Sequence, residues 1–139
     1  MNEHDIVEHL NAHSLPFVKM LGGHVAEVDL EQKTCTFEFN ISTDFCHSID
    51  IVQGGFVTAM LDAAMSHAVF GLDKSIENVS SLEIKTNYLE PTRAGKLRAI
   101  GSILKSGYKV AFLEAQLFNE EGLLTATASS VAKLVRAKA

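Results

Sequence analysis

The chain has 139 residues, of which 47% are hydrophobic and only two are prolines, so it is long enough for one domain with a substantial core. The N-terminus lacks the basic and then apolar order of a signal peptide, and no run of about 18 uninterrupted apolar residues predicts a membrane span. We therefore expect a single domain over residues 1–139, located in the cytoplasm and without a membrane partner.

The formal net charge of −5 conceals an uneven distribution along the chain. Residues 1–78 contain 3 Lys or Arg against 12 Asp or Glu, whereas residues 79–139 contain 9 against 5. The basic residues of the second half are dispersed and do not interleave with aromatic residues as on a nucleic-acid-binding surface. This distribution argues against a nucleic-acid partner and permits a small phosphorylated ligand.

The two cysteines, Cys35 and Cys46, have neither a CxxC spacing nor another paired-ligand spacing. They are typical of reduced packing residues, not of a disulfide or a metal site. The histidines are not spaced as metal ligands either. We therefore expect no metal and no other cofactor.

The N-terminal part predicts one helix and one hairpin. A short helix is expected over residues 3–12, because Ile6, Val7 and Leu10 fall on one stripe. Residues 21–30 have a Gly-Gly pair near their start, at Gly22-Gly23, and residues 33–41 alternate cleanly between apolar and polar side chains. We expect these two segments to form strands joined by a turn at Glu31-Gln32.

The central segment, from about Gly55 to Gly71, is rich in Ala, Met and Leu and predicts a helix roughly 24 Å long. Almost every side of it is apolar, so we expect it to be buried nearly all round. The exceptions are Thr58, Asp62 and Ser66, which are spaced by four and share one face. A lone carboxylate in an apolar helix is costly unless it has a partner or a task, so Asp62 is a candidate functional residue.

Four further strand signals follow, at residues 80–91, 95–107, 109–122 and 123–136. The turns between them are typical of an antiparallel meander. A sheet of about six strands needs an apolar element on its concave face, and only the central helix is available. The sequence therefore predicts an α+β fold in which an antiparallel sheet of about six strands wraps around one long helix.

The common signatures of NTPases, dinucleotide enzymes, serine hydrolases and zinc proteases are absent from the sequence. Instead, Gln53-Gly54-Gly55 opens the central helix, and Asp62 follows nine residues after the glutamine. Together with Asn-Tyr-Leu-Glu-Pro at residues 87–91 and Lys-Ser-Gly-Tyr-Lys at 105–109, this order resembles the hotdog-fold acyl-CoA thioesterases of the phenylacetic-acid-pathway (PaaI) type. The resemblance covers nearly the whole chain.

The resemblance implies a role for several residues. Asp62 would be the catalytic carboxylate, the backbone amides of Gly54 and Gly55 would polarise the thioester carbonyl, and Ser81 would help to place water. The geometry of the family implies that Asp62 of one subunit faces the Gln-Gly-Gly turn of its neighbour. Taken on the residues alone, the turn could be purely structural and Asp62 could pair with Lys or Arg across an oligomer interface.

Two positions depart from the common pattern of the family. His47 falls where many relatives have Asn, and Gln53 falls where many have His. A glutamine cannot change charge with pH, so Gln53 could only hydrogen-bond the thioester carbonyl or orient the acyl group.

These residue types suit thioester hydrolysis. Free backbone N–H groups at a helix N-terminus are fixed donors for the negative charge that develops on the thioester oxygen. Asp62 could act as a general base on water or as a nucleophile that forms a mixed anhydride, and both routes stay open.

Coenzyme A carries phosphates, and the basic second half of the chain supplies candidate partners for them. The predicted coenzyme A contacts are Arg93, Lys105, Gly107 and Lys109. The acyl chain is expected to lie along the central helix against Phe56 and Met60. Aromatic, medium-chain and long-chain acyl groups all stay open.

We therefore predict an enzyme that hydrolyses an acyl-CoA to a free acid and coenzyme A. Because the edge of a six-stranded sheet must be paired, we expect a homo-oligomer, either a dimer with a continuous sheet or a tetramer. Two alternatives remain: an enoyl-CoA hydratase of the same fold, and a non-catalytic acyl-CoA-binding module that would release no thiol.

Overall fold

The computed structural model describes residues 1–138. Two short helices, α1 (Glu3–Ala12) and α2 (Pro16–Met20), precede the strands β1 (Gly23–Asp29) and β2 (Thr34–Ile41). A 3-10 turn, η1 (Thr43–Phe45), leads to the long helix α3 (Gly54–Leu72). Four strands follow: β3 (Ile76–Tyr88), β4 (Gly95–Ser106), β5 (Val110–Asn119) and β6 (Leu124–Arg136).

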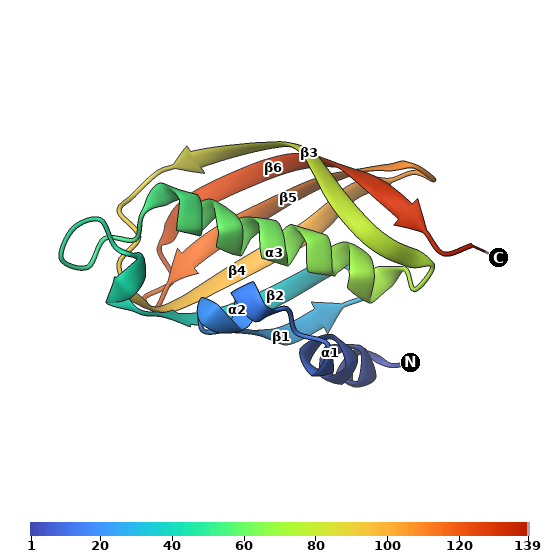
Figure 1. Cartoon of the computed structure of the whole chain (residues 1–139), viewed down its shortest axis with the longest axis horizontal. Coiled ribbons are helices and arrows are strands. Elements are labelled where there is room, and N and C mark those ends of the chain that lie inside the picture. Colours follow the sequence, from blue (N-terminus) through green and yellow to red (C-terminus); the bar gives the residue numbers. More distant parts are fainter. Residues whose placement is uncertain (139) are drawn as a thin grey trace.

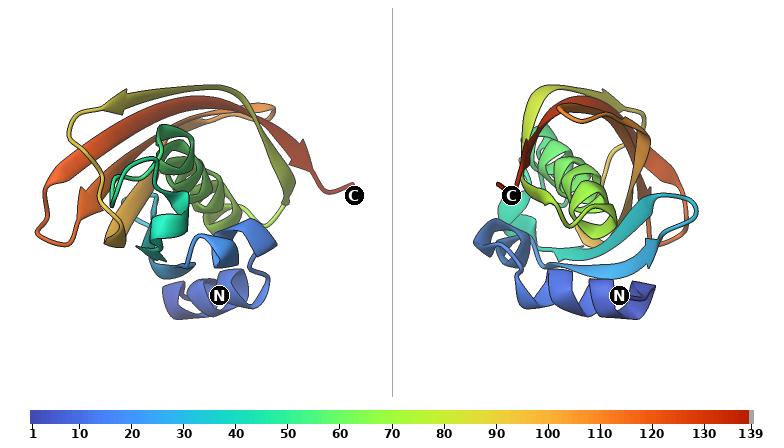
Figure 2. Two further views of the ribbon diagram at one scale, coloured as in Figure 1. Left: turned by 60° about the vertical axis from the view of Figure 1, so that its left-hand side comes forward. Right: turned by 90° about the vertical axis from the view of Figure 1, so that its right-hand side faces the viewer.

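All six strands form one antiparallel sheet in the order β1-β2-β4-β5-β6-β3. Figure 1 shows α3 lying along the concave face of this sheet, with α1 and α2 beside β1. Figure 2 shows the sheet curving around the helix, with β1 and β2 on one side and β6 and β3 on the other. The predicted α+β architecture, with about six strands around a central helix, is confirmed.

The alternation of β2 determines which of its faces meets the helix. Its apolar side chains Cys35, Phe37, Phe39 and Ile41 are all buried, whereas Glu38 on the opposite face is exposed. The hairpin with β1 turns at residues 30–33, where the sequence predicted a turn. The alternation of apolar and polar residues in the β2 sequence therefore predicted correctly which β2 side chains lie in the core.

At Gly101 on β4 the backbone of α3 lies directly against the sheet. A Cβ atom on this glycine would meet the carbonyl oxygen of Ala64 at 2.2 Å, a distance that no side chain can occupy. The absence of a side chain at Gly101 therefore fixes how deeply α3 is seated and, through it, the position of every residue on the helix.

One side of α3 is not covered by the sheet. Phe56 is 38% exposed. Ala59, Asp62, Ser66 and Phe70, which follow it at helical spacing, are only half-buried. The prediction that the helix is buried nearly all round was therefore wrong along this stripe, because a single curved sheet covers only part of a helix's circumference. We call these five residues the open stripe of α3.

By length and composition α3 could also cross a membrane. The core helix of a globular domain passes the same test, and α3 packs against the sheet with 56% of its apolar window buried. Its apolar composition is explained by that packing.

We predict that Gly101→Ala destabilises the fold by about 1–3 kcal/mol, because the added methyl group overpacks the contact between β4 and α3. Thermal unfolding followed by circular dichroism measures the effect. Gly107→Ala is the matched control, since its Cβ would meet only the Val110 carbonyl oxygen at 3.3 Å in an exposed hairpin. Equal melting temperatures for the two variants would contradict the proposed role of Gly101.

Candidate active site

Asp62 lies on the open stripe and is held by a strand residue. Its Oδ1 accepts a hydrogen bond from the Ser81 hydroxyl at 2.9 Å. The register between β3 and β6 shifts between Ser81 and Glu83, which is a β-bulge. Ser81 pairs with the buried Ala132 and therefore lies on the helix side of the sheet. The structure thus brings together two residues that the sequence analysis named separately.

The surroundings of Asp62 change its acidity. Burial raises the pKa of Asp62 above its ordinary value of 3.8, and the Ser81 hydrogen bond and the nearby His67 partly oppose this rise. A carboxylate with a raised pKa is a stronger base. None of the Lys or Arg side chains within residues 1–138 forms an ion pair with Asp62.

The N-terminus of α3 treats its two glycine amides differently. Gln53 is the N-cap residue, and its Oε1 accepts a hydrogen bond from the Gly55 N–H at 2.7 Å. The Gly54 N–H has no acceptor in the described part of the chain. The prediction that both amides are free donors is therefore corrected: only Gly54 presents an open N–H, because Gln53 caps its own helix.

Tyr88, at the end of β3, supports this helix start. Its hydroxyl donates to the Gly54 carbonyl oxygen at 2.8 Å and lies 3.0 Å from the Thr58 hydroxyl. A Cβ on Gly54 would meet the Tyr88 ring at 3.1 Å, so the ring packs directly on the glycine. In the sequence Tyr88 is recognisable only as part of the motif at residues 87–91, because its contact with Gly54 depends on the strand register.

A surface cavity of ≈ 590 Å³ opens beside this helix start. Gln53, Gly54 and Gly55 line it together with Tyr88 and His47. The Nδ1 of His47 is 2.8 Å from the hydroxyl of the neighbouring Ser48, and the side chain is exposed. The structure therefore places His47 with the Gln-Gly-Gly turn and not with Asp62.

A second cavity, of ≈ 650 Å³, lies between α1, the C-terminal half of α3 and the start of β3. Asp62, Ser66, His67 and Phe70 form its α3 side. His67 was not among the predicted site residues, although a lone histidine five residues after the candidate acid in an apolar helix is a signal for such a role.

Asp62 and Gly54 do not meet within one chain. They are eight residues apart on the same helix, which separates them by about 12 Å along its axis. The two cavities that they line share no residue. A reaction that uses both groups on one carbonyl therefore needs a second copy of the chain.

The predicted coenzyme A contacts fall into two separate groups. Arg93 forms an ion pair with Asp50 at 2.7 Å, near the N-terminus of α3. Lys105, at the end of β4, and Gly107 and Lys109, in the turn before β5, are exposed at the opposite end of β4. A strand of this length spans about 40 Å, so one chain cannot bring both groups to one ligand.

The predicted acyl contacts also separate. Phe56 is exposed on the open stripe, and its ring meets that of Phe45 edge to face with 4.9 Å between centroids. Met60 is 0% exposed and packs in the core. We therefore remove Met60 from the substrate contacts: it shares a helix face with Phe56, four residues earlier, but its side chain is completely enclosed by the core, whereas Phe56 is 38% exposed.

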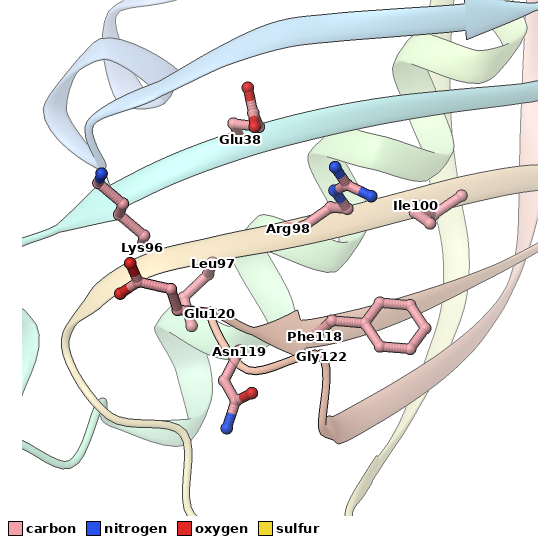
Figure 3. Close-up of a pocket in the computed structure, with 9 residues that line it drawn as sticks. All are labelled: Glu38, Lys96, Leu97, Arg98, Ile100, Phe118, Asn119, Glu120 and Gly122. Carbon is pink, nitrogen blue, oxygen red and sulfur yellow. The ribbon is translucent and has the colours of Figure 1, made fainter.

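A further hollow of ≈ 450 Å³ lies on the outer face of the sheet (Figure 3). Its charged lining residues are Glu38, Lys96, Arg98 and Glu120. The signs of these charges are mixed, and none of the predicted site residues lies there. This hollow is therefore separate from the candidate site.

We predict that Asp62→Asn raises the stability of the protein at neutral pH. A raised pKa means that the folded state resists ionisation of Asp62, so its contribution lowers stability as pH rises from the unfolded value of 3.8 through the folded pKa. The asparagine oxygen can still accept the Ser81 hydrogen bond. Melting temperatures measured between pH 4 and 8 should fall less with rising pH in Asp62→Asn than in the unmodified protein; parallel curves would contradict the prediction.

Comparison with known proteins identifies the family and the fold of the chain. The model of the thioesterase superfamily matches residues 50–126. The medium/long-chain acyl-CoA thioesterase YigI of Escherichia coli K12 is 24% identical, over 90% of this chain and 89% of YigI. A phenylacetic acid degradation-related protein from Ralstonia eutropha JMP134 is 27% identical, with a TM-score of 0.83 over 92% of this chain and 98% of the other.

The PaaI protein of Escherichia coli shares the fold, with a TM-score of 0.82 at 15% identity over 96% of this chain and 95% of PaaI. The matched family region runs from the loop before α3 into β6 and contains Gln53, Gly54, Asp62 and Ser81. The chain belongs to the thioesterase superfamily.

Proposed function

We propose that this protein is an acyl-CoA thioesterase that hydrolyses its substrate to a free acid and coenzyme A at a site shared by two subunits. The observation that carries the proposal is the Asp62 carboxylate on the open stripe of an apolar helix, bonded to Ser81 and without a Lys or Arg partner in residues 1–138. Such a carboxylate is costly for stability, and a catalytic task accounts for its presence.

The two edges of the sheet differ in a way that supports a dimer. At the β1 edge, the Asn11 side chain of α1 bonds both backbone groups of Val25, at 2.8 and 2.9 Å. At the other edge, β3 pairs only with β6 among the described strands. An open strand of 13 residues is a template for pairing with a second copy.

Antiparallel pairing of β3 with a second β3 would assemble the site. A two-fold axis perpendicular to the sheet at Ile84 would set the Ser81 end of one β3 beside the Tyr88 end of the other. Because Ser81 contacts Asp62 and Tyr88 contacts Gly54, this register brings the carboxylate of one subunit toward the free amide of the other. The symmetry of the pair creates two equivalent sites.

Each group then has a defined role in hydrolysis. The Gly54 N–H donates to the thioester oxygen as negative charge develops there. The Oε1 of Gln53 is occupied by the Gly55 N–H, so its Nε2 is the end of the amide that remains free to donate to the same oxygen. Asp62 either removes a proton from the attacking water and passes it to the leaving coenzyme A thiolate, or attacks the carbonyl itself and expels the thiolate; in the second route water then cleaves the mixed anhydride to the free acid and supplies the proton for the thiolate.

The lining of the cavity beside Asp62 is suited to binding an aliphatic acyl group. Apart from the residues of α3, most of the residues that line this cavity are apolar, among them Ile6, Leu10, Leu15, Phe17 and Val79. We propose medium- or long-chain acyl-CoA substrates, in agreement with the name of the relative YigI.

We predict that Asp62→Asn and Asp62→Ala fold and bind acyl-CoA but lose about 10²–10⁴-fold in hydrolysis rate, since the proton-accepting or attacking group is gone. Thiol release from a panel of aromatic, medium-chain and long-chain acyl-CoAs measures this loss. Full activity in both variants would refute the role of Asp62. Absence of hydrolysis by the unmodified protein on the whole panel would favour a binding module.

We also predict that Gly54→Pro loses about 10²–10³-fold in kcat, because proline removes the one open N–H. The backbone should accept this change: Gly54 is the first residue of α3, and Gln53 before it has an extended conformation (φ −62°, ψ 139°). Gly54→Ala is the control, since it adds the Cβ against Tyr88 but keeps the N–H. A similar loss in both variants would contradict the role of this donor.

A further inference from the structure

The floor of the cavity beside Asp62 contains a buried histidine, His67, which is 7% exposed. Its ring packs edge to face against Phe37 and Phe70, with centroid distances of 4.9 and 5.8 Å. The imidazole is therefore confined on two sides by aromatic rings, and its orientation is fixed.

The hydrogen bond made by one ring nitrogen of His67 determines whether the other nitrogen is a donor or an acceptor. Nδ1 lies 2.8 Å from the Ala63 carbonyl oxygen. A carbonyl oxygen only accepts, so Nδ1 carries the hydrogen and donates. Burial lowers the pKa of His67, which favours the neutral ring. The Nε2 of a neutral ring with hydrogen on Nδ1 is an acceptor.

This acceptor has no partner within the described chain. Nδ1 makes the ring's hydrogen bond, and Nε2 makes none. Among the described residues, the buried side-chain polar atom left without a partner is Ser130 Oγ, so Nε2 is not sealed in the core. Since His67 lines the cavity beside Asp62, Nε2 opens on that cavity.

We infer that His67 selects acyl groups that carry a hydroxyl several carbons beyond the thioester carbonyl, with Nε2 accepting the hydrogen bond from that hydroxyl. The inference rests on the proposed function, because it places the acyl chain in this cavity. A buried acceptor that is matched by a ligand donor discriminates against the ligand that leaves it unpaired.

The geometry sets where the hydroxyl must be. His67 follows Asp62 by five residues, which is about 7.5 Å along the helix axis. An acyl chain whose thioester carbonyl lies at Asp62 reaches His67 only after several carbon atoms. A hydroxyl next to the thioester would instead lie beside Asp62 and could not form the hydrogen bond to His67 Nε2.

Three thioesters of one chain length test the inference: octanoyl-CoA, β-hydroxyoctanoyl-CoA and ω-hydroxyoctanoyl-CoA. For the unmodified protein we expect kcat/KM for the ω-hydroxy substrate to exceed that for octanoyl-CoA by about tenfold, with no gain for the β-hydroxy substrate. His67→Phe should abolish this ratio, because it keeps an aromatic ring but removes the acceptor. His67→Gln, whose side-chain oxygen is an acceptor, should restore part of it.

His24→Phe is the matched control: it makes the same change on the exposed face of β1, and the ratio should stay at the unmodified value. Equal kcat/KM for the three substrates in the unmodified protein would overturn the inference and leave the thioesterase proposal standing. A preference that survives in His67→Phe would also overturn it. Absence of hydrolysis on all three substrates and on the wider panel would remove both proposals together.

Discussion

One constraint organises this molecule: a single apolar helix must fill the concave face of a curved six-stranded sheet and still leave one stripe uncovered. Gly101 lets α3 sit directly on β4, and the alternating apolar side chains of the strands enclose its other sides. On the open stripe a carboxylate is tolerated at moderate cost, because it is only half-buried. Asp62 lies on that stripe, where burial raises its pKa and Ser81 still gives it a hydrogen bond.

The same constraint divides the chemistry between the two ends of one helix. The free Gly54 amide belongs to the N-terminus, where unpaired N–H groups are unavoidable. The carboxylate and the buried His67 lie farther along, beside a cavity closed by α1. A rigid helix cannot fold back to join them, so assembly of two chains becomes part of the proposed catalytic design. The open β3 edge, which carries both Ser81 and Tyr88, is the element suited to that assembly.

Much of this architecture could be predicted from the sequence, because periodicity reports directly on burial. The apolar run of α3 and the strand patterns on either side of it predicted the fold, and the spacing between Gln53 and Asp62, together with the motifs at residues 87–91 and 105–109, predicted the family. Three features could not be predicted from the sequence, because they depend on the three-dimensional arrangement of the elements. The packing around α3 determines that Met60 is enclosed by the core, the N-cap geometry determines that Gln53 occupies the Gly55 amide, and the strand register determines that Tyr88 packs on Gly54.

The central claim is that Asp62 of one subunit and Gly54 of another act on the same thioester. It is tested most directly by co-expressing Asp62→Asn and Gly54→Pro chains with different affinity tags and purifying the mixed dimer. In that dimer one of the two shared sites combines an intact Asp62 with an intact Gly54, so thiol release should return to about half of the unmodified rate per dimer. A mixed dimer as inactive as either parent variant would contradict the shared site.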